Sequence, residues 1–132
     1  MLQYNPDDDL PVSDWTALDE SEQISAVRRY HEQEGIDVPN LDLHAILHTI
    51  IENQVALESE TPVPDALDRL QDEGLSRHDA IHAVATVLMD HFDSVIGLTK
   101  ESEGTSESFD VDGYYRDVRS LTKDDWLSMM DG

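Results

Sequence analysis

The stretch that decides the fold runs from Asn40 to Leu57 and reads NLDLHAILHTIIENQVAL. Its apolar residues recur every three or four positions, the spacing of a helix that buries one face. They are Leu43, Ile46, Leu47, Ile50 and Leu57. Asn40 is a favoured N-cap residue, so we expect a helix over residues 41–58. On that helix His44, His48 and Glu52 lie one turn apart along a single face.

A second pair of histidines with the same spacing follows, His78 and His82 in the segment SRHDAIH of residues 76–82. If the two helices pack face to face, four imidazoles and one carboxylate come together in a small volume. Neutral imidazole is a good ligand for Zn, Fe, Cu and Ni. The two pairs therefore predict a transition-metal site, with Zn or Fe as the expected ion.

The expected metal ligands are His44, His48, His78 and His82. Glu52 is either a fifth ligand or a partner that orients one of the imidazoles. Four protein ligands would close a tetrahedron around Zn and indicate a structural role, whereas an open position would permit activation of a water molecule. The spacing does not choose between these two possibilities.

A helical wheel at 100° per residue places the second histidine pair beside the apolar stripe rather than at its centre. That stripe contains Ile81, Val84 and Leu88. Both pairs can thus meet at a half-buried seam, while His91 falls about 140° from His78 and is left off the site. The alternative interpretation is a buried polar network of histidines in a non-catalytic protein-interaction module.

The residues that start and end helices elsewhere in the chain predict an all-α fold. We expect a small bundle of about four helices with an irregular acidic C-terminal tail. Residues 1–18 read as an extended N-terminal arm, residues 19–98 as the helical bundle domain and residues 99–132 as an acidic linker and docking tail. Besides the central helix, we expect helices over about 19–35, 64–73 and 76–97. Gly35 and Gly74 are placed to end two of them.

The tail combines a polar linker with a cluster of apolar residues. Residues 101–108 contain no apolar side chain, whereas Tyr114, Tyr115, Trp126 and Leu127 follow soon after. We expect these side chains to dock on the bundle or on a second copy of the chain, as a strand-like segment followed by a short helix after Thr122. The alternative is a recognition peptide that binds a protein partner.

The chain carries 30 acidic and 8 basic residues, a formal net charge of -22 over 132 residues. This excludes direct phosphate binding to nucleic acid, which needs a basic patch. Acids dispersed along the whole chain favour adaptation to a salt-rich cytosol, because salt shortens the Debye length to about 3 Å at 1 M. An acidic mimic of nucleic acid is the alternative.

Other sequence signals bound the location and the chemistry. There is no cysteine, no apolar run long enough to cross a membrane and no signal peptide, so we expect a soluble cytoplasmic protein without a membrane partner. No cysteine nucleophile, nucleophile elbow, phosphate-binding glycine loop or His-Glu-x-x-His motif occurs. The sequence therefore predicts a site but assigns no reaction, and whether the protein is an enzyme stays open.

Residues 39–88 resemble a family of small prokaryotic helical proteins that is defined only as a domain of unknown function. Its pattern is His-x3-His-x3-Glu-x-Gln followed by His-x3-His, matched here by His44, His48, Glu52, Gln54 and the pair at 78 and 82. The resemblance implies that these side chains act together. Some relatives carry a carboxylate where this chain has Thr86. In outline, the order of His31 and the later histidines also resembles haemerythrin-like di-iron bundles, but the closing His-x4-Asp is missing.

Overall fold

The computed structural model describes the backbone of residues 3–101 and 110–131, and the side chains of residues 3–91 and 110–128. Within these ranges every regular element is helical, which confirms the predicted all-α fold. The elements are α1 (Val12–Thr16), α2 (Glu20–Gln33), α3 (Leu41–Ala56), the 3-10 turn η1 (Glu58–Glu60), α4 (Val63–Asp72), α5 (Arg77–Glu101), α6 (Val111–Ser120) and α7 (Lys123–Asp131). The described chain has more helices than predicted, because the arm and the tail form short helices too.

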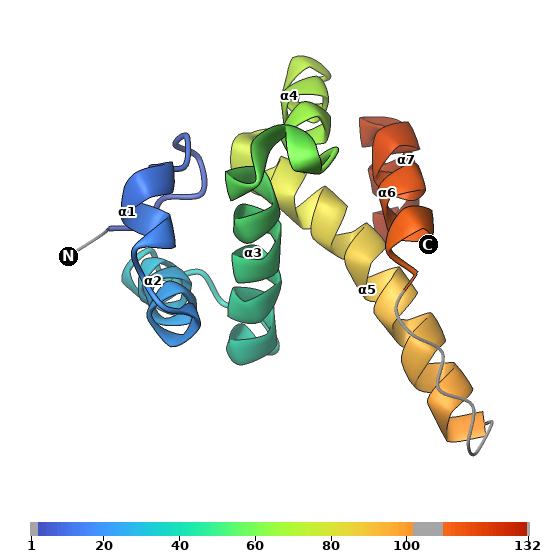
Figure 1. The fold of residues 1–132 in the computed structure, drawn as a ribbon, viewed down its shortest axis with the longest axis horizontal. Helices are drawn as coiled ribbons and strands as arrows, with labels where there is room; N and C mark the ends of the chain where they lie inside the picture. Colours follow the sequence, from blue (N-terminus) through green and yellow to red (C-terminus); the bar gives the residue numbers. More distant parts are fainter. Residues whose placement is uncertain (1–2, 102–109, 132) are drawn as a thin grey trace.

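Helix α3 lies at the centre of the molecule (Figure 1). Helices α1 and α2 pack against one side of α3, and α5 crosses its other side. Helix α4 contacts both α3 and α5, while α6 and α7 pack on α5. The site described below lies where α2, α3 and α5 meet. Among the described residues, no helix is both long enough and apolar enough to cross a bilayer.

Local capping explains where the helices around the site begin and end. The Asp19 side chain accepts a hydrogen bond from the Glu22 backbone N–H in a capping box that starts α2. Asn40 accepts from the Leu43 N–H at 3.1 Å and starts α3. Gly35 has a φ of +67°, a left-handed conformation that ends α2 and turns the chain toward α3.

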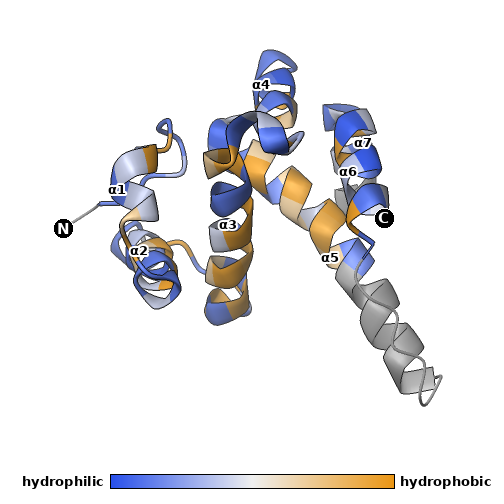
Figure 2. Cartoon of the chain, in the orientation of Figure 1, coloured by the Kyte–Doolittle hydropathy of each residue, from blue (hydrophilic) through white to orange (hydrophobic). Residues whose placement is uncertain are grey.

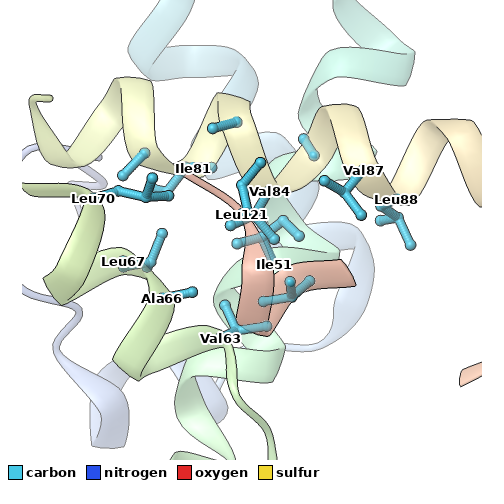
Figure 3. Close-up of a cluster of buried hydrophobic side chains, with 14 of the residues drawn as sticks. Ile51, Val63, Ala66, Leu67, Leu70, Ile81, Val84, Val87, Leu88 and Leu121 are labelled. Atoms are coloured by element: carbon cyan, nitrogen blue, oxygen red, sulfur yellow. The ribbon is translucent and has the colours of Figure 1, made fainter. Parts of the chain in front are cut away.

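The main hydrophobic core lies between α3, α4, α5 and the C-terminal helices. Figure 2 shows hydrophobic residues concentrated along α3 and the first half of α5. Figure 3 shows side chains from these elements pointing toward one another. Those labelled are Ile51, Val63, Ala66, Leu67, Leu70, Ile81, Val84, Val87, Leu88 and Leu121, all buried. Burial of this set fixes α3 against α5, and with it the relative position of the two histidine pairs.

A second buried cluster attaches the N-terminal arm to the opposite side of α3. It contains Tyr4, Trp15, Ala26, Val27 and Ala45. The arm was expected to be extended, but its apolar Trp15 lies on the short helix α1 and is fully buried. The Trp15 indole N–H donates to Asn53 Oδ1 of α3 at 2.9 Å.

The segment expected to be an irregular tail with one short helix after Thr122 forms two helices, α6 and α7. Their aromatic and aliphatic side chains Tyr114, Val118, Leu121 and Trp126 are buried in the main core. Arg69 Nη2 of α4 donates to the carbonyl oxygens of Val118 and Leu121, at 3.1 and 2.6 Å, and so caps the end of α6. The polar linker, apart from Glu101 at the end of α5, lies outside the described residues.

Candidate metal centre

Five histidine side chains converge where α2, α3 and α5 meet. They are His31, His44, His48, His78 and His82. Each offers one ring nitrogen, and these five nitrogens all lie within 4.8 Å of one another. The two predicted pairs do meet at one site, and a fifth histidine joins them.

Three of the histidines form a tight triangle through their Nε2 atoms. His48 Nε2 lies 3.1 Å from His44 Nε2 and 3.3 Å from His82 Nε2. The Nε2 atoms of His44 and His82 are 3.2 Å apart. The triangle thus combines both histidines of α3 with one of α5.

The other two rings pack against this triangle and against each other, with 5.4 Å between the ring centroids of His31 and His78. The ring of His78 lies one turn before His82, with 4.3 Å between the ring centroids, and 5.0 Å from the ring of His48. The ring of His31 lies 4.6 Å from that of His44 and 5.1 Å from that of His48.

Sequence reasoning missed His31 as a member of the site. It stands near the end of α2, without a second histidine one turn away, so no local spacing marks it. The turn at Gly35 and the packing of α2 on α3 bring it to the site. In the sequence, His31 was singled out only by the order of histidines that resembles haemerythrin-like bundles.

A buried relay fixes the protonation of His48. Tyr4 Oη donates its proton to Glu52 Oε2 at 2.5 Å. Because this is the only proton of the hydroxyl, Tyr4 Oη accepts a hydrogen bond from His48 Nδ1–H at 3.1 Å. With its proton on Nδ1, neutral His48 presents the lone pair of Nε2 to the triangle. This is the arrangement in which an outer carboxylate orients a metal-binding imidazole through a hydrogen bond.

Glu52 itself does not belong to the converging group, and its carboxylate is engaged elsewhere. It accepts from Arg77 Nη1 at 2.9 Å and from Arg77 Nη2 at 2.7 Å. Both side chains are buried, with 0% of the Glu52 side chain and 5% of the Arg77 side chain exposed. Of the two roles predicted for Glu52, this geometry corresponds to the partner that orients an imidazole.

His31 is held in the same tautomer by the backbone. Its Nδ1 lies 2.9 Å from the Val27 carbonyl oxygen, which can only accept, so Nδ1 carries the proton. The Nε2 atoms of His31 and His78 are buried and have no hydrogen-bond partner among the described residues. A buried polar atom without a hydrogen-bond partner costs folding free energy. The Nε2 atoms of His31 and His78 are therefore expected to have a partner of another kind.

The environment keeps four of the site histidines, His44, His48, His78 and His82, neutral. Burial, followed by repulsion from a neighbouring histidine, lowers the pKa of His44, His78 and His82 to about 4. The same causes lower the pKa of His48 well below its usual value. These imidazoles therefore have unprotonated nitrogens available at neutral pH.

The residues around the site have other partners. Gln54, the last residue of the His-x3-His-x3-Glu-x-Gln pattern, accepts from Tyr114 Oη at 2.7 Å and joins α3 to α6. His91 lies off the site, as predicted, with Nε2 at 2.8 Å from Asp117 Oδ2. Asp79 Oδ1 lies 3.7 Å from His82 Nδ1 at the exposed rim.

The arrangement can bind a cation through several neutral nitrogens at once, in a pocket whose inner side is closed. His31 and His48 are fully buried, whereas His44, His78 and His82 are half-buried. Comparison of the chain with protein-family models, with curated proteins and with solved structures finds no match in any of the three.

Proposed function

We propose that the protein binds a divalent transition-metal ion, Zn²⁺ or Fe²⁺, through its histidine cluster. The supporting observation is the size of the triangle formed by His44, His48 and His82, with sides of 3.1–3.3 Å. Nitrogens bound at about 2.0–2.1 Å lie about 3.3 Å apart around a tetrahedral ion and about 3.0 Å apart around an octahedral one. The observed separations fall in that interval.

Hydrogen bonds alone do not account for the triangle. Because His48 Nε2 has no proton, it can only accept, so His44 and His82 would both have to donate to it. Their two N–H groups would then face each other across 3.2 Å. A cation removes this conflict, since it accepts the lone pairs of all three nitrogens at once.

His31 and His78 supply the further ligands in this proposal. Each has a buried Nε2 without a hydrogen-bond partner among the described residues, and coordination would satisfy that atom. The number of bound histidines then depends on the ion, because Zn²⁺ in proteins is mostly four-coordinate. A bound Zn²⁺ would leave one of the five histidines outside its coordination shell.

The donor set indicates the class of ion. All five converging side chains are neutral nitrogen donors, and none is a carboxylate. Ca²⁺ and Mg²⁺ prefer oxygen ligands, whereas imidazole suits Zn, Fe, Cu and Ni. The negative net charge of the chain adds a general attraction for cations.

The test is the metal content of protein purified without a histidine tag or chelator. We expect close to one transition-metal ion per chain by elemental analysis. His48→Ala and His82→Ala should each lower the occupancy sharply, because both remove a corner of the triangle. His91→Ala is the matched control and should leave the occupancy unchanged, since His91 bonds to Asp117 instead. Metal-free protein without affinity for any of these ions would refute the proposal.

A further inference from the structure

A cavity adjoins the histidine triangle on its exposed side. It has a volume of about 310 Å³ and lies between α3 and α5, beside α7. His44 and His82 form part of its wall, so two corners of the triangle border it. Leu47, Met89 and Trp126 are the large apolar residues of its wall. An ion held by the triangle would therefore lie at one side of this cavity.

The two faces of the histidine cluster differ in access. On the inner face, His31 and His48 are 0% and 1% exposed, and Tyr4 covers His48. On the cavity face, 29% of the His82 side chain is exposed. A small molecule can thus approach the ion from the cavity, on the side of His44 and His82.

The charge of the site favours an anion there. Five neutral imidazoles leave the charge of a divalent ion uncompensated by its ligands. The nearest buried carboxylate, Glu52, is already paired with Arg77 in a two-point ion pair. In a partly buried site an uncompensated charge interacts strongly with an ion of opposite sign.

The rest of the cavity wall favours an apolar body on that anion. Apart from the two histidines, its described lining comprises Ala85, Thr86 and the three apolar side chains named above, without any Asp, Glu, Lys or Arg. The Thr86 hydroxyl already donates to the His82 carbonyl oxygen at 2.9 Å. A dry apolar cavity of about 150 Å³ admits benzene, so this volume is sufficient for a single ring with a carboxylate.

We propose that this cavity binds a small organic monoanion, whose carboxylate takes an additional position on the metal ion beside His44 and His82, since a four-coordinate ion such as Zn²⁺ can expand to five ligands. Its apolar body would pack against Leu47, Met89 and Trp126. The inference rests on the proposed function, because the ion supplies the positive charge. It adds the class of ligand, which the histidine cluster alone does not define.

Full-length protein loaded with Co²⁺ provides the test, because the visible absorption of Co²⁺ reports its coordination. Benzoate should change this absorption in a saturable manner at constant ionic strength. Benzamide has the same shape without the charge and should leave the absorption unchanged. Acetate should bind about tenfold more weakly or worse, because it lacks the apolar group that the cavity would bury.

Variants then locate the binding in the cavity. Met89→Trp should fill it and abolish the response to benzoate while the Co²⁺ spectrum persists, and Ala85→Leu tests the same point at a second position. Ile46→Trp, at an exposed position of α3 outside the cavity wall, is the control and should respond as the natural chain does.

The outcomes separate this inference from the proposed function. Bound Co²⁺ with a spectrum that benzoate does not alter would overturn the inference and leave the metal site intact. An equal response to benzoate and acetate, or a full response in both cavity-filling variants, would also overturn it. Failure of the protein to bind Co²⁺ at all would overturn both.

Discussion

At the scale of single residues, Tyr4 has the most specific contribution to the candidate site. Its hydroxyl stands between the Glu52 carboxylate and His48 Nδ1, at 2.5 and 3.1 Å. Burial and the adjacent negative charge of Glu52 raise its pKa well above the usual value, so the hydroxyl keeps its proton. The neutral Tyr4 hydroxyl therefore links the Glu52 carboxylate to the His48 imidazole through two successive hydrogen bonds.

We expect Tyr4→Phe to lower the affinity for Zn²⁺ by about 10–100-fold, the usual effect of losing an outer partner of a metal-binding histidine. Without the hydroxyl, His48 loses the acceptor that holds its proton on Nδ1. Competition with a chromogenic chelator measures the affinity. Tyr30→Phe is the control, because the Tyr30 ring packs on His31 and His78 but its hydroxyl makes no bond to a site residue. Equal affinities in the two variants would show that the relay does not tune the site.

The lowered histidine pKa values predict that metal-free protein loses stability in weak acid. The pKa of His44, His78 and His82 is about 4 in the folded chain, below the value of about 6.5 in an unfolded one. Between those values the unfolded chain binds more protons, so the free energy of unfolding falls as the pH falls from about 6.5 to 4. Above about pH 6.5 these histidines are neutral in both the folded and the unfolded chain, so their titration no longer lowers the free energy of unfolding.

Urea denaturation of metal-free protein over roughly pH 5–7.5, the range in which histidines titrate, measures this dependence. A double variant, His44→Gln with His82→Gln, should show a shallower decline because two of the titrating groups are gone. A decline of the same steepness in both proteins would assign the acid sensitivity to other groups.

At the scale of helices, the buried pair of Arg77 and Glu52 joins three elements. Arg77 is the first residue of α5, Glu52 lies on α3, and Arg77 Nη1 also donates to the Pro6 carbonyl oxygen of the arm at 2.9 Å. Asp7 Oδ1 accepts from the His78 backbone N–H at 3.2 Å and holds the arm to the start of α5. The N-terminal arm is thus bonded to the two helices that carry four of the site histidines.

Arg77→Ala should lower the free energy of unfolding by about 3–5 kcal/mol, because it leaves the Glu52 carboxylate buried without its partner. Chemical denaturation measures the loss. Arg28→Ala removes a pair with Asp42 in which 45% and 75% of the side chains are exposed, so it should cost less than about 1 kcal/mol. Adding Glu52→Gln to Arg77→Ala should recover part of the stability. Equal costs for the two arginine variants would contradict this account.

At the scale of the whole molecule, the net charge of -22 dominates the electrostatics. Only 8 basic residues are present to pair with 30 acids, so most acidic side chains have no basic side chain of their own to balance their charge. Such self-repulsion destabilises a compact state, and salt weakens it by screening. Adaptation to salt, with mimicry of nucleic acid as the alternative, therefore stays a prediction that the response of the fold to salt tests.

The melting temperature should therefore rise as KCl increases from about 0.1 to 2 M, over which the Debye length falls from about 10 Å to below 3 Å. Calorimetry or circular dichroism of metal-free protein measures it, so that salt effects on metal binding do not enter. The same series in sorbitol of equal osmolality controls for general solvent exclusion. A melting temperature that is indifferent to KCl would instead favour a functional role for the acids.

The sequence by itself determined the features that depend on short-range geometry. The 3.6-residue period of a helix stacks residues four apart, so the pairing of His44 with His48 and of His78 with His82 follows from spacing alone. The cap at Asn40 and the left-handed turn at Gly35 are also local, and the structure has them where the sequence predicts them. The all-α fold follows from the same periodic pattern.

Only the tertiary structure decided which further groups reach those pairs. His31, Tyr4 and Arg77 come to the site from α2, the arm and the start of α5. Tyr4, for example, stands 48 positions before Glu52, to which it donates. Their placement depends on how whole faces of helices pack, and no local spacing encodes that. Glu52 shows the difference most clearly, because its helix position suited a metal ligand until the packing of α5 placed Arg77 against it.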